Sequence, residues 1–593
     1  MDYNICAKLF KDLPQFKRIL EESDSLETAR DRLLVELERL VETNVDDVLN
    51  LSGLQFSLRL SCARAFRQFL CKRSIKLTGF DLLKVLWHIA RNEFDLIEQP
   101  VSPAFVEDVA RIFAGISGNA GIYDVSETEL EKGRQAALHR SQSLNEIFEK
   151  SENEIHKYSS GLDPERIEER HKNKIRIMKF FNCSDAEFSS HEWQLDHIVR
   201  NSETLEQLVE LNAEEKKSID LAKQAGLPFG ITPYYATLFC EKPDTGIDQA
   251  IRAQVIPPLK YVEAMIEGLN NRKEKFDFMR EADTSPIDLI TRRYPRIAIL
   301  KPYNTCSQIC VYCQRNWEID DAYIPQAFAS ETKIEEAIQW IENTPSLSEI
   351  LVTGGDPLVM PDNYIKRILN RLASIKNIRR IRFGTRTPVV LPQRFTDELL
   401  EIFALHHIPG QREICFVTHF EHSLEVTPEA MEAVQKIRKG GMGVYNQAVF
   451  TFYNSRRFEL AALRKWLRLI GVEPYYSFNA KGKKETASYR VPIARLQQEA
   501  KEEARLLPGM ERTDEPVFNV PGLGKNYLRA EQNHLLLTIL PDGSRVYEFH
   551  PWEKFIKHAK SYIHIDVPIL DYLKRLENVG EKIEDYKTIF YYF

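Results

Sequence analysis

A run of alternating strand and helix patterns over residues 296–480 constrains this chain more than any other feature. Short apolar stretches recur there, each followed by a loop and then by a segment with helical apolar spacing. Six such units in a row predict an α/β fold with a parallel sheet and right-handed crossovers. Eight units would close a full barrel, so six predict a partial barrel that is open along one side. We expect its chemistry at the carboxyl ends of the strands.

The expected strands are Ile297–Leu300, Glu349–Thr353, Ile378–Phe383, Ile414–Thr418, Val444–Phe450 and Pro474–Phe478. The expected amphipathic helices between them are Glu331–Glu342, Asn363–Ser374, Asp397–Leu405, Pro428–Arg438 and Phe458–Leu469. Residues 1–180 are expected to form a large all-helical extension, with helical spacing in Ser25–Leu49, Gln55–Phe69, Phe80–Ile89 and Leu130–Ile155. Leu535–Leu540 and Arg545–Phe549 flank Pro541-Asp542-Gly543 and predict a β-hairpin in a small C-terminal α+β segment, which a helical tail follows.

These patterns divide the chain into four expected regions. Residues 1–180 form a helical domain whose role the sequence does not indicate, and 181–290 form a helical lead-in. Residues 291–480 form the partial barrel, and 481–593 form the C-terminal segment. A chain of 593 residues is too long for one core, so several domains are expected.

Three cysteines stand directly after the first expected strand, with the spacing C-x3-C-x2-C. They are Cys306, Cys310 and Cys313. Four thiolates normally hold an iron–sulfur cluster, so three thiolates on a [4Fe–4S] cluster leave one iron open. An open iron can bind S-adenosylmethionine (SAM) and cleave it to a 5′-deoxyadenosyl radical. The pattern therefore predicts a cluster at which SAM is cleaved.

Two simpler interpretations compete with the cluster. Cysteines at these spacings would also share one face of a helix and form an inert core. A zinc site is the second alternative, but zinc usually takes a fourth Cys or His ligand. The context argues against both, because Pro302 and Asn304 end the strand and place the cysteines in a loop.

Composition excludes several other functions. The net charge is −7, so no basic surface indicates nucleic acid. No apolar run approaches the length of a membrane span, and the N-terminus lacks a secretory pattern. Nine cysteines with one tight group fit a reducing compartment, so we expect a cytoplasmic protein. The other six are expected to be small core residues, namely Cys6, Cys62, Cys71, Cys183, Cys240 and Cys415.

Two further motifs indicate ligand binding. Gly354 and Gly355 end the second expected strand, where they would allow a ligand close to the backbone, and Asp356 would accept from an ammonium group such as that of SAM. A tight turn is the alternative. Far along the chain, Lys525 follows two glycines, and its amine would form a Schiff base with pyridoxal phosphate (PLP). An exposed loop lysine is the alternative there.

Taken together, the motifs from about Trp193 to Phe549 resemble the lysine 2,3-aminomutase family, which combines radical SAM chemistry with PLP. The landmarks include Ile231–Tyr235, Arg293–Pro295, the cysteine loop, Gly354–Asp356, Arg386–Arg394, Thr418–Phe420, Asn446-Gln447 and Pro474–Tyr476. The resemblance implies a radical SAM partial (β/α)6 barrel, three cofactors (a [4Fe–4S] cluster, SAM and PLP), a reductant such as flavodoxin or ferredoxin, and a homo-oligomer.

The resemblance also implies residue roles. Lys525 would carry PLP, with Arg293 at its phosphate and Tyr294 near its ring. His419 and Gln447 would contact SAM. Arg315 would bind the α-carboxylate of an amino-acid substrate, since its planar fork matches both oxygens.

Three departures from the family pattern stand out. The second arginine on the phosphate side falls on Ile297, and Arg296 is displaced by one residue. The C-terminal zinc-binding cysteines of the family are absent, so the same intersubunit contact is not implied. The glycine loop before Lys525 is one residue shorter.

The substrate pocket differs from that of the lysine enzyme. Where the lysine enzyme binds the distal ammonium with two aspartates, this chain has Lys481 and Asn519. A lysine and an amide suit a distal carboxylate instead, as in the glutamate 2,3-aminomutase branch. We therefore expect conversion of L-glutamate to β-glutamate, with aspartate or another acidic amino acid still open.

Three other functions compete with this one. Lysine or arginine would be the substrate if Lys481 pointed out of the pocket into a solvated loop. A relative that modifies a lysyl group on a translation factor is disfavoured by the long helical extension. An iron–sulfur protein with only a binding role would need neither Lys525 nor Arg315.

Overall fold

The computed structural model describes residues 2–42, 53–122, 132–243, 246–480, 485–530, 533–552 and 560–593. The chain forms two compact units. One unit comprises residues 151–490 and 503–525 and contains the barrel. The other comprises residues 1–150, 491–502 and 526–593.

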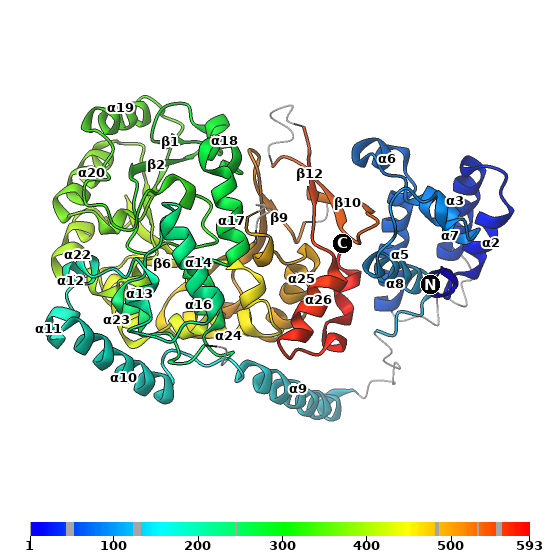
Figure 1. The fold of residues 1–593 in the computed structure, drawn as a ribbon, viewed down its shortest axis with the longest axis horizontal. Helices are drawn as coiled ribbons and strands as arrows, with labels where there is room; N and C mark the ends of the chain where they lie inside the picture. The colour runs from blue at the N-terminus through cyan, green and yellow to red at the C-terminus, as the bar shows by residue number, and fades with distance from the viewer. Residues whose placement is uncertain are drawn as a thin grey trace. The chain divides into compact units, whose positions relative to one another are not determined.

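The barrel is built from six parallel strands in sequential order, with helices between them (Figure 1). The strands are β2 (Ile297–Tyr303), β3 (Glu349–Gly354), β4 (Arg380–Gly384), β5 (Glu413–Thr418), β6 (Gly443–Phe450) and β7 (Glu473–Asn479). The main helices are α19 (Glu331–Glu342), α20 (Asp362–Ser374), α22 (Asp397–Ala404), α23 (Pro428–Lys439) and α24 (Glu459–Ile470). This confirms the expected partial barrel, and the predicted bounds agree within two residues at almost every end.

Alternate residues of the strands face opposite sides of the sheet, and the helix-facing side is apolar. One row of paired positions runs across five strands and is fully buried, namely Leu300, Val352, Phe383, Phe416 and Val444. On α22, Phe403 packs edge-on against two of them, with ring centroids 4.9 Å and 5.0 Å apart. This packing fixes which side of each strand faces the helices.

The other side of the sheet carries charged residues near the start of the strands. Arg380 on β4 pairs with Glu349 at 3.0 Å and Glu413 at 2.5 Å, on the strands to either side. Arg382, two residues further along β4, also pairs with Glu349 at 2.5 Å. These ion pairs link three neighbouring strands at the amino-terminal end of the barrel interior.

The sheet is wider than the sequence pattern indicates. Its order is β1 to β9, with β1 (Ile290–Thr291) antiparallel to β2 and β8 (Glu515–Val520) parallel to β7. The last strand is β9 (Gly524–Tyr527). No expected helix separates β8 from β9, and β1 has two residues, so neither edge shows the repeated strand–helix pattern.

Helices before the barrel cover the region around the cysteine loop. They are α10 (Pro164–Phe181), α11 (Asp185–Phe188), α12 (His191–Asp196), α13 (Ser202–Leu205), α14 (Ala213–Gln224), α15 (Pro233–Ala236), α16 (Gln249–Val255), α17 (Leu259–Gly268) and α18 (Arg272–Phe276). Backbone hydrogen bonds join this region to the cysteine loop, from Ile309 to the carbonyl of Gly230 and from Val311 to that of Gln254. The lead-in therefore helps to fix the loop.

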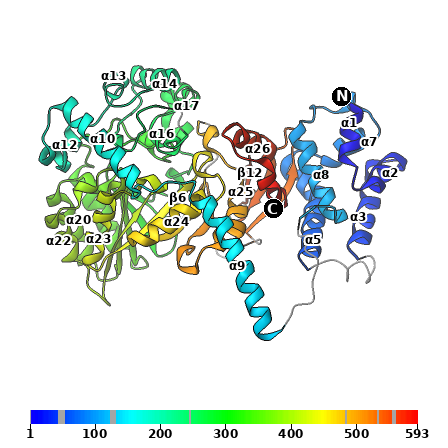
Figure 2. The same cartoon turned by 90° about the horizontal axis from the view of Figure 1, so that it is seen from below.

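The second unit combines the N-terminal helices with the C-terminal sheet. Its helices are α1 (Asp2–Leu9), α2 (Pro14–Glu22), α3 (Leu26–Glu42), α5 (Gly53–Phe69), α6 (Lys72–Thr78), α7 (Leu82–Ala90), α8 (Pro103–Ser117), most of α9 (Gly133–Ile155), α25 (Ile493–Gln498) and α26 (Ile569–Asn578). The expected helices here are confirmed, apart from the part of Ser25–Leu49 and Leu130–Ile155 that lies outside the described residues. In Figures 1 and 2, α5 and α8 lie side by side, where Cys62 packs against Gly115.

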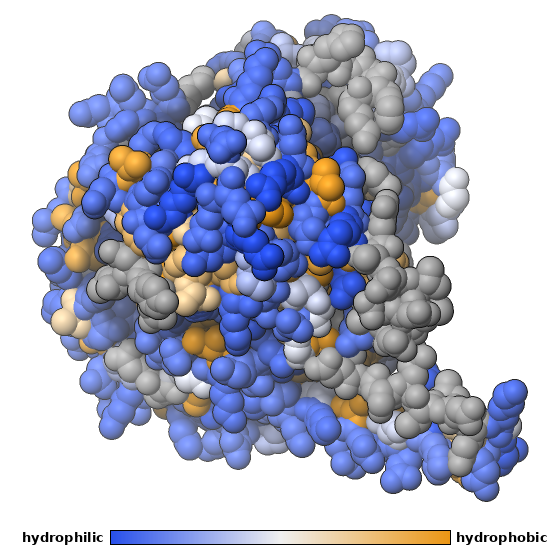
Figure 3. Space-filling model, turned by 90° about the vertical axis from the view of Figure 1, so that its right-hand side faces the viewer, coloured by the Kyte–Doolittle hydropathy of each residue, from blue (hydrophilic) through white to orange (hydrophobic). Residues whose placement is uncertain are grey.

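The predicted hairpin is confirmed within this unit. Strands β10 (His534–Ile539) and β11 (Arg545–Phe549) are antiparallel, and β12 (Tyr562–Ile565) adds a third strand that the sequence pattern did not reveal. Arg545 pairs with Asp108 on α8 at 2.7 Å, and both side chains are 1% exposed. Figure 3 looks onto the N-terminal helices, where the described surface is mostly hydrophilic with small scattered apolar groups.

Candidate functional site

The three cysteines of the motif lie in a loop directly after β2, as predicted. The loop is held at Cys306, whose carbonyl accepts from the backbone N–H of Tyr323 at 2.8 Å. A backbone turn joins the other two, from the N–H of Cys313 to the carbonyl of Cys310 at 3.2 Å. The core-helix alternative is therefore wrong, because none of the three lies in a helix.

The thiols lie in a buried, electrostatically coupled environment. Burial raises the pKa of Cys306 well above its ordinary value, and the nearby Asp356 and the other two thiols raise this pKa further. Burial also raises the pKa of Cys310. Such thiols stay protonated without a cation, so deprotonation is coupled to binding of a positively charged group.

Gly354 and Gly355 let the cysteine loop approach the end of β3. A Cβ atom on Gly355 would lie 2.1 Å from the carbonyl oxygen of Thr305, and Gly354 adopts a φ of +123°. The N–H of Gly355 donates to the carbonyl of Tyr303 at 2.9 Å, and the N–H of Asp356 donates to that of Thr305 at 2.8 Å. The cysteine loop itself therefore makes the close approach to the backbone that these two glycines allow.

The Asp356 side chain joins the ends of β3 and β4. It accepts from the Thr385 hydroxyl at 2.7 Å, the Arg386 N–H at 2.8 Å and the Leu358 N–H at 3.0 Å. Burial raises its pKa, and these donors act in the opposite direction. Asp356 therefore has a structural role in addition to the predicted contact with the ammonium of SAM.

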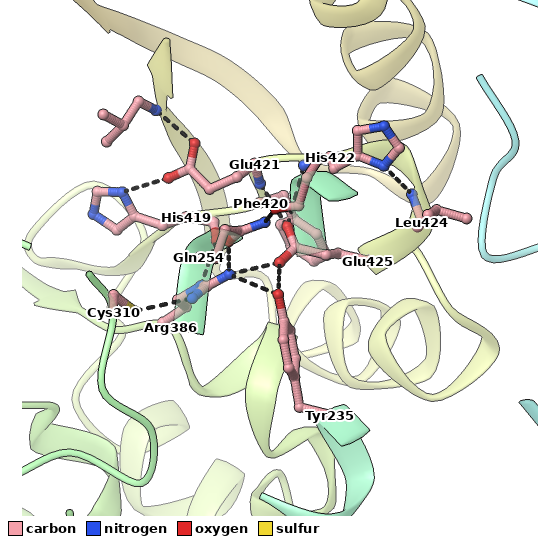
Figure 4. A network of polar contacts seen from close by, with 12 residues as sticks. Tyr235, Gln254, Cys310, Arg386, His419, Phe420, Glu421, His422, Leu424 and Glu425 are labelled. Carbon is pink, nitrogen blue, oxygen red and sulfur yellow. Dashed lines mark hydrogen bonds and ion pairs between the residues drawn. The ribbon is translucent and has the colours of Figure 1, made fainter. Parts of the chain in front are cut away.

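A buried network of polar contacts surrounds Arg386 beside the cysteine loop (Figure 4). Its Nη1 donates to Sγ of Cys310 at 2.9 Å, and its Nη2 pairs with Glu425 at 2.6 Å. Nη2 also donates to Gln254, and the hydroxyl of Tyr235 donates to Glu425 at 2.7 Å. Arg386 is 8% exposed and Glu425 is fully buried, so their ion pair fixes the guanidinium beside the thiol of Cys310.

The two residues expected at SAM lie after β5 and within β6. His419 follows β5, and its Nδ1 lies 3.7 Å from Oε1 of Glu421 (Figure 4). Burial raises the pKa of Glu421, which accepts from the N–H of Val449 at 2.6 Å. Gln447 lies on β6 at a half-buried position. His419 thus lies at the carboxyl edge of the sheet, whereas Gln447 lies within β6, before the end of that strand at Phe450.

Lys525 lies on β9 in an aromatic setting. Its Nζ lies 5.2 Å from the ring centroid of Tyr294 and 4.9 Å from that of Tyr476. The Tyr294 hydroxyl accepts from the backbone N–H of Lys525 at 2.7 Å. Burial, with help from Arg382 and Arg293, lowers the pKa of Lys525 to about 8. The neutral, nucleophilic fraction of its amine near neutral pH is therefore far larger than that of an ordinary lysine.

The glycines before Lys525 form a tight turn. Gly522 and Gly524 have φ values of +70° and +89°, which favour glycine. The N–H of Gly522 donates to the carbonyl of Met279 at 3.1 Å. The turn returns the chain directly from β8 into the strand that carries Lys525.

Arg293 and Arg315 meet at a carboxylate that the sequence reasoning missed. Arg315 donates from Nε and Nη2 to Glu281 at 2.9 Å and 2.6 Å, and Arg293 lies 3.8 Å from the same carboxylate. Lys301 on β2 also pairs with Glu281 at 3.1 Å. The only sequence signal for Lys301 was a lysine within an apolar strand.

Comparison with known proteins identifies the family. The Radical SAM superfamily model matches residues 300–457. An uncharacterized KamA family protein of Methanocaldococcus jannaschii is 42% identical over the whole of this chain and 98% of its own length. The chain belongs to the KamA family. The resemblance indicated by the motifs is thereby confirmed, and the protein is a radical SAM enzyme of the aminomutase class.

Two proteins named as aminomutases are similar to this chain over about half of its length. The glutamate 2,3-aminomutase of Clostridioides difficile is 33% identical over 56% of this chain and 74% of its own length. The L-lysine 2,3-aminomutase of Bacillus subtilis is 31% identical over 55% and 65%. These two identities do not distinguish the substrates.

Membership of the radical SAM superfamily implies a [4Fe–4S] cluster and SAM, and the cysteine loop fits the cluster. Among the described residues, no three His, Cys, Asp or Glu side chains are grouped closely enough to hold a single metal ion. A cubane cluster instead takes one thiolate on each of three different irons, which keeps the sulfur atoms apart.

The surroundings of Lys525 likewise fit PLP. The lysine amine is buried, two tyrosine rings flank it, and two arginines approach it. Nε of Arg382 is buried and has no hydrogen-bond partner in the described part of the chain. These groups suit an aldehyde, an aromatic ring and an anion.

The two residues expected to select the substrate are only partly described. Asn519 lies on β8 and is half-buried, whereas Lys481 lies outside the described residues. The register pairs Phe478 on β7 with Val517 on β8. Continuing that register places Asn519 beside Ala480, the residue before Lys481.

No described helix is long and apolar enough to span a membrane.

Proposed function

We propose that this protein is a PLP-dependent radical SAM 2,3-aminomutase that converts L-glutamate to β-glutamate. One observation carries the proposal. The same unit places a three-cysteine loop after β2 and a buried lysine of lowered pKa, Lys525, between two tyrosine rings. An iron–sulfur protein with only a binding role has no need of such a lysine.

The chain supplies binding, orientation and shielding from water. Cys306, Cys310 and Cys313 would hold the cluster, and His419 and Gln447 would contact SAM. When bound, the cluster and SAM supply a radical that can remove hydrogen from C3 of the substrate, and PLP carries the amino group during its migration.

Residues around Lys525 would orient the substrate. Arg293 would bind the phosphate of PLP, and Tyr294 would fix the ring position through its contact with Lys525. Arg315 would bind the α-carboxylate. Lys525 would carry PLP through its Nζ, whose pKa burial lowers to about 8, so that the neutral amine is available near that pH. The enclosed setting would keep water from the reacting carbon.

The substrate follows from charge complementarity. Lys481 would form an ion pair with a distal carboxylate, and Asn519 would donate a hydrogen bond to it. A distal ammonium would instead meet a like charge at Lys481. Conversion of lysine or arginine is the alternative, and L-lysine 2,3-aminomutases are also among the relatives.

The experiment is an air-free assay of the reconstituted protein with PLP, SAM and a reductant. L-Glutamate, L-aspartate, L-lysine and L-arginine are supplied separately, and NMR detects the β-amino isomer. β-Glutamate supports the proposal. β-Lysine would retain the reaction type and show that Lys481 does not face the substrate. No isomer from any of the four would overturn the proposal.

Two variants separate the cofactor assignments. Cys313→Ala should abolish formation of 5′-deoxyadenosine, with Cys183→Ala as a control outside the motif. Lys525→Ala should remove the absorbance of covalently bound PLP. Persistence of either signal would contradict the corresponding assignment.

A further inference from the structure

Glu281 is a buried carboxylate surrounded by three cations. Both of its oxygens lie 2.6 Å from Nη2 of Arg315, and Oε2 lies 3.1 Å from Nζ of Lys301. Nη2 of Arg293 lies 3.8 Å from Oε1. The Glu281 side chain is 10% exposed, so solvent screens these contacts only weakly.

The backbone holds Glu281 in this position. Its N–H donates to Oδ1 of Asp277 at 2.8 Å, and the next N–H, that of Ala282, donates to Oδ2 at 3.1 Å. Burial alone would raise the pKa of Glu281, but Arg315, Lys301 and Arg293 outweigh it and lower the pKa to about 2. The carboxylate is therefore ionised at any physiological pH.

The pairing uses only part of the Arg315 guanidinium. Nε and Nη2 both donate to Glu281, which fixes the plane of the group. Nη1 is buried and has no hydrogen-bond partner among the residues that the structure describes. A buried N–H without a partner is costly, so this nitrogen is a site for an incoming anion.

We propose that Glu281 is a positioning residue that holds Arg315 with Nη1 directed toward the α-carboxylate of the substrate. This inference rests on the proposed function. It also changes how Arg315 acts, because the Nε–Nη2 edge of its fork already pairs with Glu281 and the substrate is bound through Nη1. Glu281 stays in place when the substrate binds.

The opposite role gives the opposite result. If Glu281 only occupied the place of the substrate carboxylate, its removal would free Arg315 and strengthen substrate binding. A positioning role predicts weaker binding, because the guanidinium loses its fixed plane and has to be ordered by the substrate itself. The direction of the change therefore decides between the two roles.

The test compares the wild-type protein with Glu281→Gln. Both are reconstituted and loaded with PLP, without SAM, and calorimetry measures binding of L-glutamate and 4-aminobutyrate. The second compound is glutamate without its α-carboxylate. If the first assay identifies lysine, the pair is L-lysine and 1,5-diaminopentane. We expect Kd for the amino acid to rise about tenfold or more, with Kd for the amine unchanged.

Two further variants keep the test decisive. Glu281→Asp retains the charge and should rescue part of the affinity for the amino acid. This variant also tests the positioning role if the Gln variant folds poorly. Glu335→Gln removes the partner of Arg371 on the exposed surface of the same unit and should change neither Kd.

Unchanged or tighter binding of the amino acid by Glu281→Gln would overturn the positioning role, as would equal losses for both compounds. A wild-type protein that binds no amino acid would overturn the proposed function and this inference together. If the wild-type protein and Glu281→Gln bind the amino acid equally well, the positioning role alone is overturned and the proposed function stands.

Discussion

Arg386 donates a hydrogen bond from Nη1 to Sγ of Cys310 across 2.9 Å while its other nitrogens pair with buried acceptors. The contact links the end of β4 to the cysteine loop. Hydrogen bonds to cluster sulfurs and nearby positive charge raise the reduction potential of an iron–sulfur cluster. Arg386 is thus expected to ease reduction of the cluster in this chain.

The first prediction concerns Arg386→Gln, which should make the midpoint potential of the reconstituted cluster more negative. It should also lower the free energy of unfolding by about 3–5 kcal/mol, because the fully buried Glu425 loses its cation. The double variant with Glu425→Gln should recover part of the stability and keep the lowered potential. A redox titration followed by electron paramagnetic resonance measures the potential, and an unchanged value would contradict the role.

The second prediction concerns the contact between Gly355 and the cysteine loop. In Gly355→Ala the new Cβ would lie 2.1 Å from the carbonyl oxygen of Thr305, so the loop has to move. Overpacking of this kind costs about 1–3 kcal/mol of unfolding free energy, and we also expect a lower iron content after reconstitution. Gly509→Ala is the control, because no atom lies within 4 Å of its Cβ position. Equal iron content in the two variants would show that the close approach of Gly355 to Thr305 does not support the cysteine loop.

The third prediction is a pH dependence. Burial lowers the pKa of Lys525 from 10.5 to about 8, so the neutral amine becomes the main form above pH 8. The rate of PLP attachment to the cluster-free protein should therefore rise with pH through about 8 and then level off. Absorbance after rapid mixing measures this rate. A rate that still rises tenfold per pH unit up to 10 would show an ordinary lysine pKa.

Much of the barrel is predictable from the sequence because its order is local. Each strand is either alternately or continuously apolar, and each helix has its own helical spacing of apolar residues. The bounds of Glu331–Glu342 are therefore predicted to the residue. β12 and β8 are different. They are recognised only through the strand beside them, and their short segments carry no repeated unit.

The candidate site is predictable in its motifs and less so in its contacts. The cysteines and Lys525 stand in distinctive local patterns. Glu281 does not, because its significance comes from cations that lie 12, 20 and 34 residues further along the chain. The network of Arg386 likewise joins residues from α15, α16 and the cysteine loop. Pairings of this kind depend on tertiary structure, which no spacing rule encodes.

The last prediction concerns the choice of substrate. Replacing Asn519 and Lys481 together by aspartate should move turnover from glutamate toward lysine, because two carboxylates would then face the distal group. Each single variant should lose glutamate turnover and gain little with lysine, since a remaining lysine repels an ammonium and a remaining amide carries no charge. The ratio of kcat/KM for the two amino acids measures the change. Asn533→Asp, an amide in the other unit, is the control and should leave the ratio unchanged. A double variant that keeps the wild-type ratio would show that these positions do not contact the distal group.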